Sequence, residues 1–257
     1  MTFEILSGAG ILVLAAYIFG GIADAVCGGG GLITVPALMS IGLPAHMVVG
    51  TNHCSMLPGC WTSCIEYGKA GKVDFKLGLC AVPFALVGAL IGARLNLILD
   101  DRYLRIIMIV LIPILAIFSI LKRDINDEDN SDSVPIKKQR IGVCCIAFIV
   151  SIYHAFYGPA SGIFYMISFA TLLKCGAVKA NGMSRFILAC VNIMTTIIYS
   201  MSGNVIWKMV IVAMVGYTIG NYAGARIAIS KGAKVIKPLY YCVLAGLMVK
   251  LVLSLLS

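Results

Sequence analysis

Four consecutive glycines, at positions 28–31, interrupt an apolar stretch and constrain the fold of this chain more than any other feature. Each glycine loses more backbone freedom on folding than any other residue, so such a run cannot continue a helix cheaply. A second run, at positions 158–162, interrupts an apolar stretch in the other half of the chain. We therefore expect the two breaks to face each other and to build one working site.

The composition predicts an all-α polytopic membrane protein. Hydrophobic residues make up 60% of the chain and charged residues 12%, whereas soluble domains contain about 45–50% apolar residues. Apolar runs at 77–99, 103–121 and 208–229 approach or exceed the roughly 20 residues that cross the hydrocarbon core. In a lipid bilayer, broken backbone persists only where protein covers it or where it lines a watery cavity.

A polar segment at 122–140 divides the chain near its middle. Its ten charges cancel and it has few large apolar residues, which is typical of an exposed flexible linker. We therefore expect a first transmembrane repeat at 1–121, a cytoplasmic linker at 122–140 and a second repeat at 141–257.

The two halves share a pattern that indicates an internal duplication. A shift of 132 positions superposes identical residues in the same order: Tyr67 on Tyr199, Gly71 on Gly203, Gly88 on Gly220, Gly92 on Gly224 and Arg94 on Arg226. The glycine pairs four residues apart lie on one helical face, where they allow a neighbouring helix to approach closely.

The placement of lysine and arginine predicts the orientation of the repeats. Basic residues gather near 69–76, 174–179 and 231–237, whereas the loop before Lys208 and the amino terminus are poor in them. Because cytoplasmic loops carry the excess of positive charge, the equivalent loops 67–76 and 199–208 should lie on opposite sides. This favours ten segments in two inverted repeats of five, with both termini outside. If the short pieces 32–40 and 163–173 are re-entrant, about eight segments and parallel halves would result.

Polar side chains near the two breaks are the candidates for binding a substrate, because polar groups at membrane depth usually face the protein interior. With one inserted residue allowed, Asn52 matches Ser184 and His53 matches Arg185. The predicted substrate site comprises Gly28, Gly29, Gly30, Gly31, Asn52, His53, Ser55, Gly158, Ser161, Gly162, Ser184, Arg185 and Asn192.

Arg185 is the most informative of these candidates. Residues 141–257 contain nine basic side chains and no acidic one, so Arg185 has no counter-ion in its own half. It can pair with Asp24 or Glu66 of the first half, or it can meet a negatively charged substrate. A guanidinium suits planar or tetrahedral oxyanions because it donates two parallel hydrogen bonds.

Three further residues are candidates for coupling or gating: Asp24, His154 and Tyr157. A buried histidine can be a core donor, a substrate ligand or a proton relay, and the coupling ion can be a proton or sodium. The three histidines lack metal-site spacing and most of the ten cysteines lie in apolar segments, so we expect neither a metal nor another cofactor. The net charge of +9 is interpreted as membrane topology and not as nucleic-acid binding.

The motifs around the breaks resemble those of the TauE/SafE family of sulfite exporters. The matching stretches are the glycine run followed by Leu32-Ile-x-Val-Pro36, Gly42-Leu-Pro44, Val49-Gly-Thr51, Gly71-x-Val73-Asp74, Gly158-Pro-x-x-Gly162 and the Gly-Ala-Arg endings at Arg94 and Arg226. The resemblance covers nearly the whole chain outside the linker. It implies a carrier of sulfite, organosulfonates such as sulfoacetate, or related sulfur or carboxylate anions.

Five residues beside the expected site depart from the family pattern. Cys27 and Ala160 stand where glycine is common, Asn52-His53 replaces a Thr-Ser-apolar sequence, and Arg185 replaces a frequent lysine. The substrate therefore need not be sulfite.

We expect secondary transport and not an enzyme, since the chain has no nucleotide-binding phosphate loop and no recognisable nucleophile with its base. A passive anion channel would use the same residues. A cation or metal exporter would instead use His53, His154 and Cys27.

Overall fold

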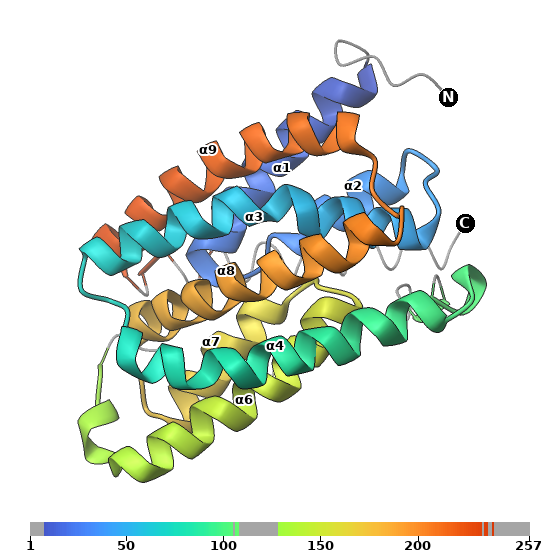
Figure 1. Cartoon of the computed structure of the whole chain (residues 1–257). Helices are drawn as coiled ribbons and strands as arrows, with labels where there is room; N and C mark the ends of the chain where they lie inside the picture. Colours follow the sequence, from blue (N-terminus) through green and yellow to red (C-terminus); the bar gives the residue numbers. More distant parts are fainter. Residues whose placement is uncertain (1–7, 105, 108–127, 233, 236–237, 239–257) are drawn as a thin grey trace.

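The computed structural model describes residues 8–104, 106–107, 128–232, 234–235 and 238. This part of the chain is helical and contains no strand (Figure 1). Its elements, in chain order, are α1 (Gly8–Cys27), α2 (Gly31–Met39), α3 (Ala45–Lys69), α4 (Phe75–Ile98), the 3-10 turn η1 (Ser131–Ser133), α6 (Ile136–Phe156), α7 (Ser161–Leu172), α8 (Ala177–Met201) and α9 (Trp207–Lys231).

Four of the described helices are long and apolar enough to cross a membrane: α1 from Gly10, α4, α6 and α8. Helices α3 and α9 are more polar but have 25 residues each, which gives a length of about 37 Å at 1.5 Å per residue. The expected spans 77–99 and 208–229 correspond to α4 and α9. Most of the expected span 103–121 lies outside the described residues.

Both glycine runs end one helix and precede a short one. After α1, Gly28 adopts a left-handed backbone with φ +80°, which glycine tolerates without steric cost. After α6, Gly158 has φ +103° and Ala160 has φ +64°. The helices that follow, α2 with 9 residues and α7 with 12, are shorter than the roughly 20 residues of a full crossing.

The helices of the first half run opposite to their counterparts in the second half (Figure 1). Helix α2 returns the chain toward the end of the molecule where α1 begins, so α3 starts at that end. Helix α7 does the same for α6 and α8 at the other end. The loop between α3 and α4 and the loop between α8 and α9 consequently lie at opposite ends of the molecule.

Each half packs its long helices against the other half. Helix α4 packs along α6, and α9 packs along α1. A β-carbon at Gly88 or Gly92 would overlap the carbonyls of Phe148 and Ile152 in α6. At Gly220 and Gly224 it would overlap the carbonyls of Ile18 and Ile22 in α1. The predicted close approach of helices at these glycine pairs is confirmed.

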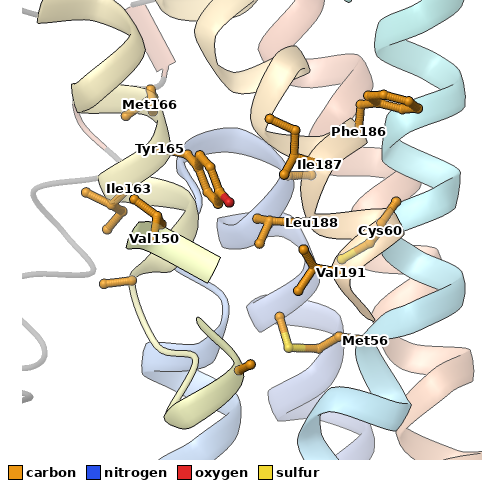
Figure 2. Close-up of a cluster of buried hydrophobic side chains, with 14 of the residues drawn as sticks. Met56, Cys60, Val150, Ile163, Tyr165, Met166, Phe186, Ile187, Leu188 and Val191 are labelled. Atoms are coloured by element: carbon orange, nitrogen blue, oxygen red, sulfur yellow. The ribbon is translucent and has the colours of Figure 1, made fainter. Parts of the chain in front are cut away.

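The molecule is apolar outside and partly polar inside, which suits a lipid environment. Large apolar side chains are exposed along the outer faces of α4 and α9, for example Ile98 and Ile211. Beside the apolar core where α3, α6, α7 and α8 meet (Figure 2), three histidine or arginine side chains are fully buried: His53, His154 and Arg185.

The described part of the predicted linker contains short helical structure. Residues 122–127 lie outside the described residues, η1 follows at Ser131–Ser133, and α6 begins at Ile136. Asp129 forms a salt bridge of 2.8 Å with Lys179 of α8. Burial raises the pKa of Asp129, but hydrogen bonds from Lys179 and Ser131 outweigh that effect and leave this pKa below its usual value. These tertiary contacts could not be predicted from the composition of the segment.

Candidate functional site

The two glycine breaks are buried and lie in backbone contact, as predicted. A β-carbon at Gly28 would overlap the backbone of Gly162 and Ile163, and one at Gly162 would overlap Gly28. A β-carbon at Gly31 would stand 2.8 Å from the α-carbon of Pro159. Only residues without a side chain permit this approach, so the glycines join the amino ends of α2 and α7 around one point.

Arg185 of α8 and Asp24 of α1 form an ion pair beside this contact. Arg185 Nη1 donates a short hydrogen bond to Asp24 Oδ2, and both side chains are almost completely buried. The backbone N–H of Gly30 also donates to Asp24 Oδ1, at 3.4 Å. Of the two counter-ions that the sequence left open, Asp24 is the partner. Glu66 instead pairs with Lys69 and Arg226.

The guanidinium of Arg185 is only partly satisfied by Asp24. Its Nε and Nη2 atoms make no hydrogen bond to any described residue, although both are buried. The Nη2 atom lies against Gly162, where any β-carbon would overlap it. An unpartnered buried donor costs about 1–3 kcal/mol, and more if it is charged. The arginine therefore has hydrogen-bonding capacity that the described protein leaves unused.

A second polar cluster joins the two buried histidines to α8. Asn192 Oδ1 accepts from His53 Nδ1 at 3.2 Å and from His154 Nε2 at 3.1 Å. Ser161 Oγ lies 2.7 Å from His154 Nδ1. Two neutral imidazoles, each donating once to Asn192, are sufficient to form these bonds. His53 Nε2 lies 3.5 Å from the place that a β-carbon of Gly158 would take, but it makes no hydrogen bond among the described residues.

Asn52 belongs to a third cluster that does not include Arg185. Its Oδ1 atom accepts from Thr34 Oγ1 at 2.7 Å and from Tyr17 Oη at 3.0 Å. Its amide nitrogen donates to Met56 Sδ at 3.2 Å. The amide thus ties α3 to α1 and α2, which stabilises the packing behind the first break.

Two predicted serine ligands are satisfied within their own helices. Ser55 Oγ donates to the carbonyl of Thr51, and Ser184 Oγ donates to that of Asn181, both at 2.7 Å. Such bonds leave the hydroxyl proton unavailable to a ligand in this conformation. Tyr157, a predicted gating residue, is buried just after α6, where its backbone N–H donates to the Tyr153 carbonyl.

The residues that hold the ends of the broken helices were absent from the predicted site. Tyr67 Oη donates to the Ala25 carbonyl at 2.8 Å, and Tyr199 Oη donates to the Ala155 carbonyl at 2.7 Å. Asn181 Nδ2 donates to the carbonyls of Ala25 and Val26. These bonds satisfy carbonyls that the end of a helix leaves without partners. The match of Tyr67 with Tyr199 in the repeat was the available sequence signal.

In the repeat expected from the sequence, the ion pair and the histidine pair fall at equivalent positions. Asp24 and His154 are 130 positions apart, as are Gly28 and Gly158, and Arg185 and His53 are 132 apart. Asp24 pairs with Arg185, and the rings of His154 and His53 meet edge to face with centroids 4.7 Å apart. One pair is thus ionic, whereas the other consists of two imidazole rings.

Among the described residues, no three His, Cys, Asp or Glu side chains come together as a group that could hold a metal ion. The buried site instead contains a guanidinium, a carboxylate, two imidazoles, amides and hydroxyls. A guanidinium with unused donors suits oxyanions.

A helical membrane protein whose two broken helices meet around buried charged and polar groups is characteristic of membrane transporters. Residues 13–251 match the family described as Sulfite exporter TauE/SafE. The chain belongs to this family, which confirms the resemblance drawn from its motifs.

Relatives of this chain carry names of the same kind. It is 32% identical over 240 residues to the probable membrane transporter protein ORF9 of Sinorhizobium sp., covering 93% of this chain and 90% of that protein. It is 30% identical over 243 residues to the probable membrane transporter protein YfcA of Escherichia coli K12, covering 94% and 88%. No solved structure matches the chain significantly.

Proposed function

We propose that this membrane transporter is a secondary carrier of small anions, such as sulfite, organosulfonates including sulfoacetate, or related sulfur or carboxylate anions. The observation that carries the proposal is the unused capacity of Arg185. Its Nε and Nη2 atoms are buried without partners among the described residues, beside the contact between the breaks. The oxygens of an oxyanion would accept hydrogen bonds from these two donors.

Charge at the site supports an anionic substrate. The amino ends of α2 and α7 bring backbone N–H groups and the positive ends of helix dipoles toward the breaks. Asp24 is the one carboxylate paired with Arg185 among the described residues. Besides the unused Nε and Nη2, an oxyanion can also take the Nη1 donor that Asp24 now occupies, because a substrate carboxylate or sulfonate has equivalent acceptor oxygens.

Two inverted repeats that rock against each other around the breaks form the proposed mechanism. Support comes from the opposite directions of equivalent helices (Figure 1) and from the matched contacts of α4 with α6 and of α9 with α1. A twofold relation with these directions has its axis in the membrane plane, as in other inverted-repeat carriers. Five segments per half would then include the stretches outside the described residues.

Uptake into proteoliposomes tests the function. Purified protein should take up sulfite or sulfoacetate with a rate that saturates, and Arg185→Gln should abolish this uptake while Arg185→Lys keeps part of it. Full uptake by Arg185→Gln would contradict the proposal. A current that does not saturate at millimolar substrate would instead indicate a passive channel.

Thermal unfolding of the wild-type protein gives a test that does not depend on a variant. A ligand that binds only the folded state stabilises it, by about 2.7 kcal/mol at a concentration of 100 Kd. The melting temperature should therefore rise with sulfite, sulfoacetate or a simple carboxylate, and chloride at equal ionic strength is the control.

A further inference from the structure

The Asp24–Arg185 pair makes the candidate anion site electrically neutral, and this neutrality restricts how an anion can enter. The negative charge of Asp24 cancels the positive charge of Arg185, and both side chains are almost fully buried. Neutral imidazoles of His53 and His154 satisfy their hydrogen bonds to Asn192. An entering monovalent anion would add one uncompensated negative charge, which is expensive at low dielectric.

The groups that face Asp24 leave few ways to compensate that charge. Helix α8 contributes Arg185, α9 contributes Tyr217, α3 contributes Cys60 and Tyr67, and α1 itself contributes Cys27. Helix α2 contributes only the Gly30 N–H, and α7 contributes the backbone of Gly162, which lies against Arg185. Neutral tyrosine and cysteine side chains do not bind an additional proton at ordinary pH. Asp24 is the one group of this set that can gain a proton.

We infer that the transporter binds its anion together with one proton: the anion replaces the Asp24 carboxylate at Arg185, and the released Asp24 carboxyl takes the proton. This inference rests on the proposed anion transport. The proton comes from the water on the side to which the site is open, and both ligands leave together on the other side. A monovalent anion would thus cross with no net charge.

Tyr217 gives the protonated carboxyl a partner. Its hydroxyl lies beside Asp24 and 3.0 Å from where a β-carbon of Gly30 would stand. The hydroxyl is buried and makes no hydrogen bond within the described part of the chain. A protonated Asp24 can donate its O–H to this oxygen, whereas an ionised carboxylate accepts from the tyrosine. Tyr217 can therefore serve both protonation states.

Binding experiments with methanesulfonate test the inference, because this anion is ionised at every pH of interest and any proton that moves belongs to the protein. Full-length purified protein in a weakly buffered solution is titrated with methanesulfonate while a pH indicator reports protons. We expect one proton taken up per anion bound. Linkage then requires the apparent affinity to fall about tenfold for each unit of pH increase.

Variants identify the group that takes the proton. Asp24→Glu keeps a titratable carboxyl and should keep the proton uptake, whereas any binding that remains in Asp24→Asn should occur without it. The matched control is Asp129→Asn, which removes a carboxylate paired with Lys179 outside the site and should keep the proton uptake. His53→Gln tests the other nearby acceptor, His53 Nε2.

Each result separates the inference from the proposed function. Anion binding without proton uptake in the wild-type protein overturns the inference and leaves anion transport intact. Proton uptake that is lost in His53→Gln but kept in Asp24→Asn also overturns it. If Asp24→Asn does not fold, retention of proton uptake in both Asp24→Glu and His53→Gln supports it. The absence of binding and uptake for every anion overturns the proposed function itself.

Discussion

Gly28 and Gly162, which are far apart in the sequence, lie in direct backbone contact, and no β-carbon fits at either position. This contact joins the ends of two broken helices, one from each half of the chain. It also positions the neighbouring Arg185, because the arginine Nη2 atom occupies the space that a side chain at Gly162 would need. The geometry of the candidate site therefore depends on two residues that lack side chains.

We predict that Gly28→Ala and Gly162→Ala both destabilise the protein strongly. Overpacking of a tight interior costs about 1–3 kcal/mol, and Gly28→Ala adds the strain of a left-handed backbone at φ +80°. Thermal unfolding in detergent measures the loss.

Gly71→Ala is the control for the glycine substitutions. Gly71 has a similar backbone, φ +68°, but nothing lies within 4 Å of its β-position. Gly71→Ala should therefore reduce the stability only by the strain of a left-handed backbone, about 1–2 kcal/mol. Equal losses for Gly28→Ala and Gly71→Ala would show that the contact with Gly162 contributes nothing.

The buried ion pair should be costly to break from either side. Asp24→Asn or Arg185→Gln alone leaves one buried charge without its partner, and such changes cost about 3–5 kcal/mol. The double variant removes both charges, so its loss should be smaller than the sum of the single losses. A double-mutant cycle on thermal stability measures this coupling.

The pair between Asp129 and Lys179 provides the comparison for that cycle. Its side chains retain 37% and 28% of their exposure, so the coupling there should stay below about 1 kcal/mol. A coupling at Asp24–Arg185 no larger than this would contradict the picture of a dry, tightly coupled pair.

Removing the hydroxyl of Tyr67 or Tyr199 should weaken the protein, and more so at Tyr67, whose oxygen also accepts from Asn181 Nδ2 at 2.8 Å. Each hydroxyl donates to the carbonyl near the end of a broken helix, that of Ala25 or Ala155. Loss of one such hydrogen bond costs about 0.5–1.5 kcal/mol. The changes are Tyr67→Phe and Tyr199→Phe, measured by thermal unfolding.

Tyr222→Phe is the matched control, since Tyr222 is 42% exposed and its ring stacks on Arg226 without needing the hydroxyl. We expect almost no change there. A loss for Tyr67→Phe without a loss for Tyr199→Phe would argue against equivalent roles in the two halves.

The loop after α3 and the loop after α8 should lie on opposite sides of the membrane. The first contains Lys72 and lies beside Lys179 and Lys231, whereas the residues between α8 and α9 carry no charge. Cytoplasmic loops are the positive ones. Reporter proteins can be fused to chains truncated after Gly71 or Gly203. The Gly71 fusion should be active with a fluorescent protein, which reports the cytoplasm. The Gly203 fusion should be active with alkaline phosphatase, which reports the outside. The same location for both fusions would exclude inverted halves.

The sequence by itself was sufficient for the class of protein and for the positions of the helix breaks. Apolar runs of bilayer length, glycine runs and matched residues in two halves can be read directly from the order of residues along the chain. Their recognition does not depend on which helices pack together. The short lengths of α2 and α7 follow from the same patterns. The first helical residue of α6, Ile136, was misplaced because the charged segment before it packs against α8.

Only the tertiary structure decided which polar groups meet. The partner of Arg185 depends on how α1 lies against α8, and that packing places Asp24 there and leaves Glu66 to Lys69 and Arg226. The same applies to Asn192, whose single amide oxygen accepts from both His53 and His154. Hydrogen bonds and ion pairs are short-ranged, so partners 139 or 161 positions apart are selected by helix packing and not by sequence spacing.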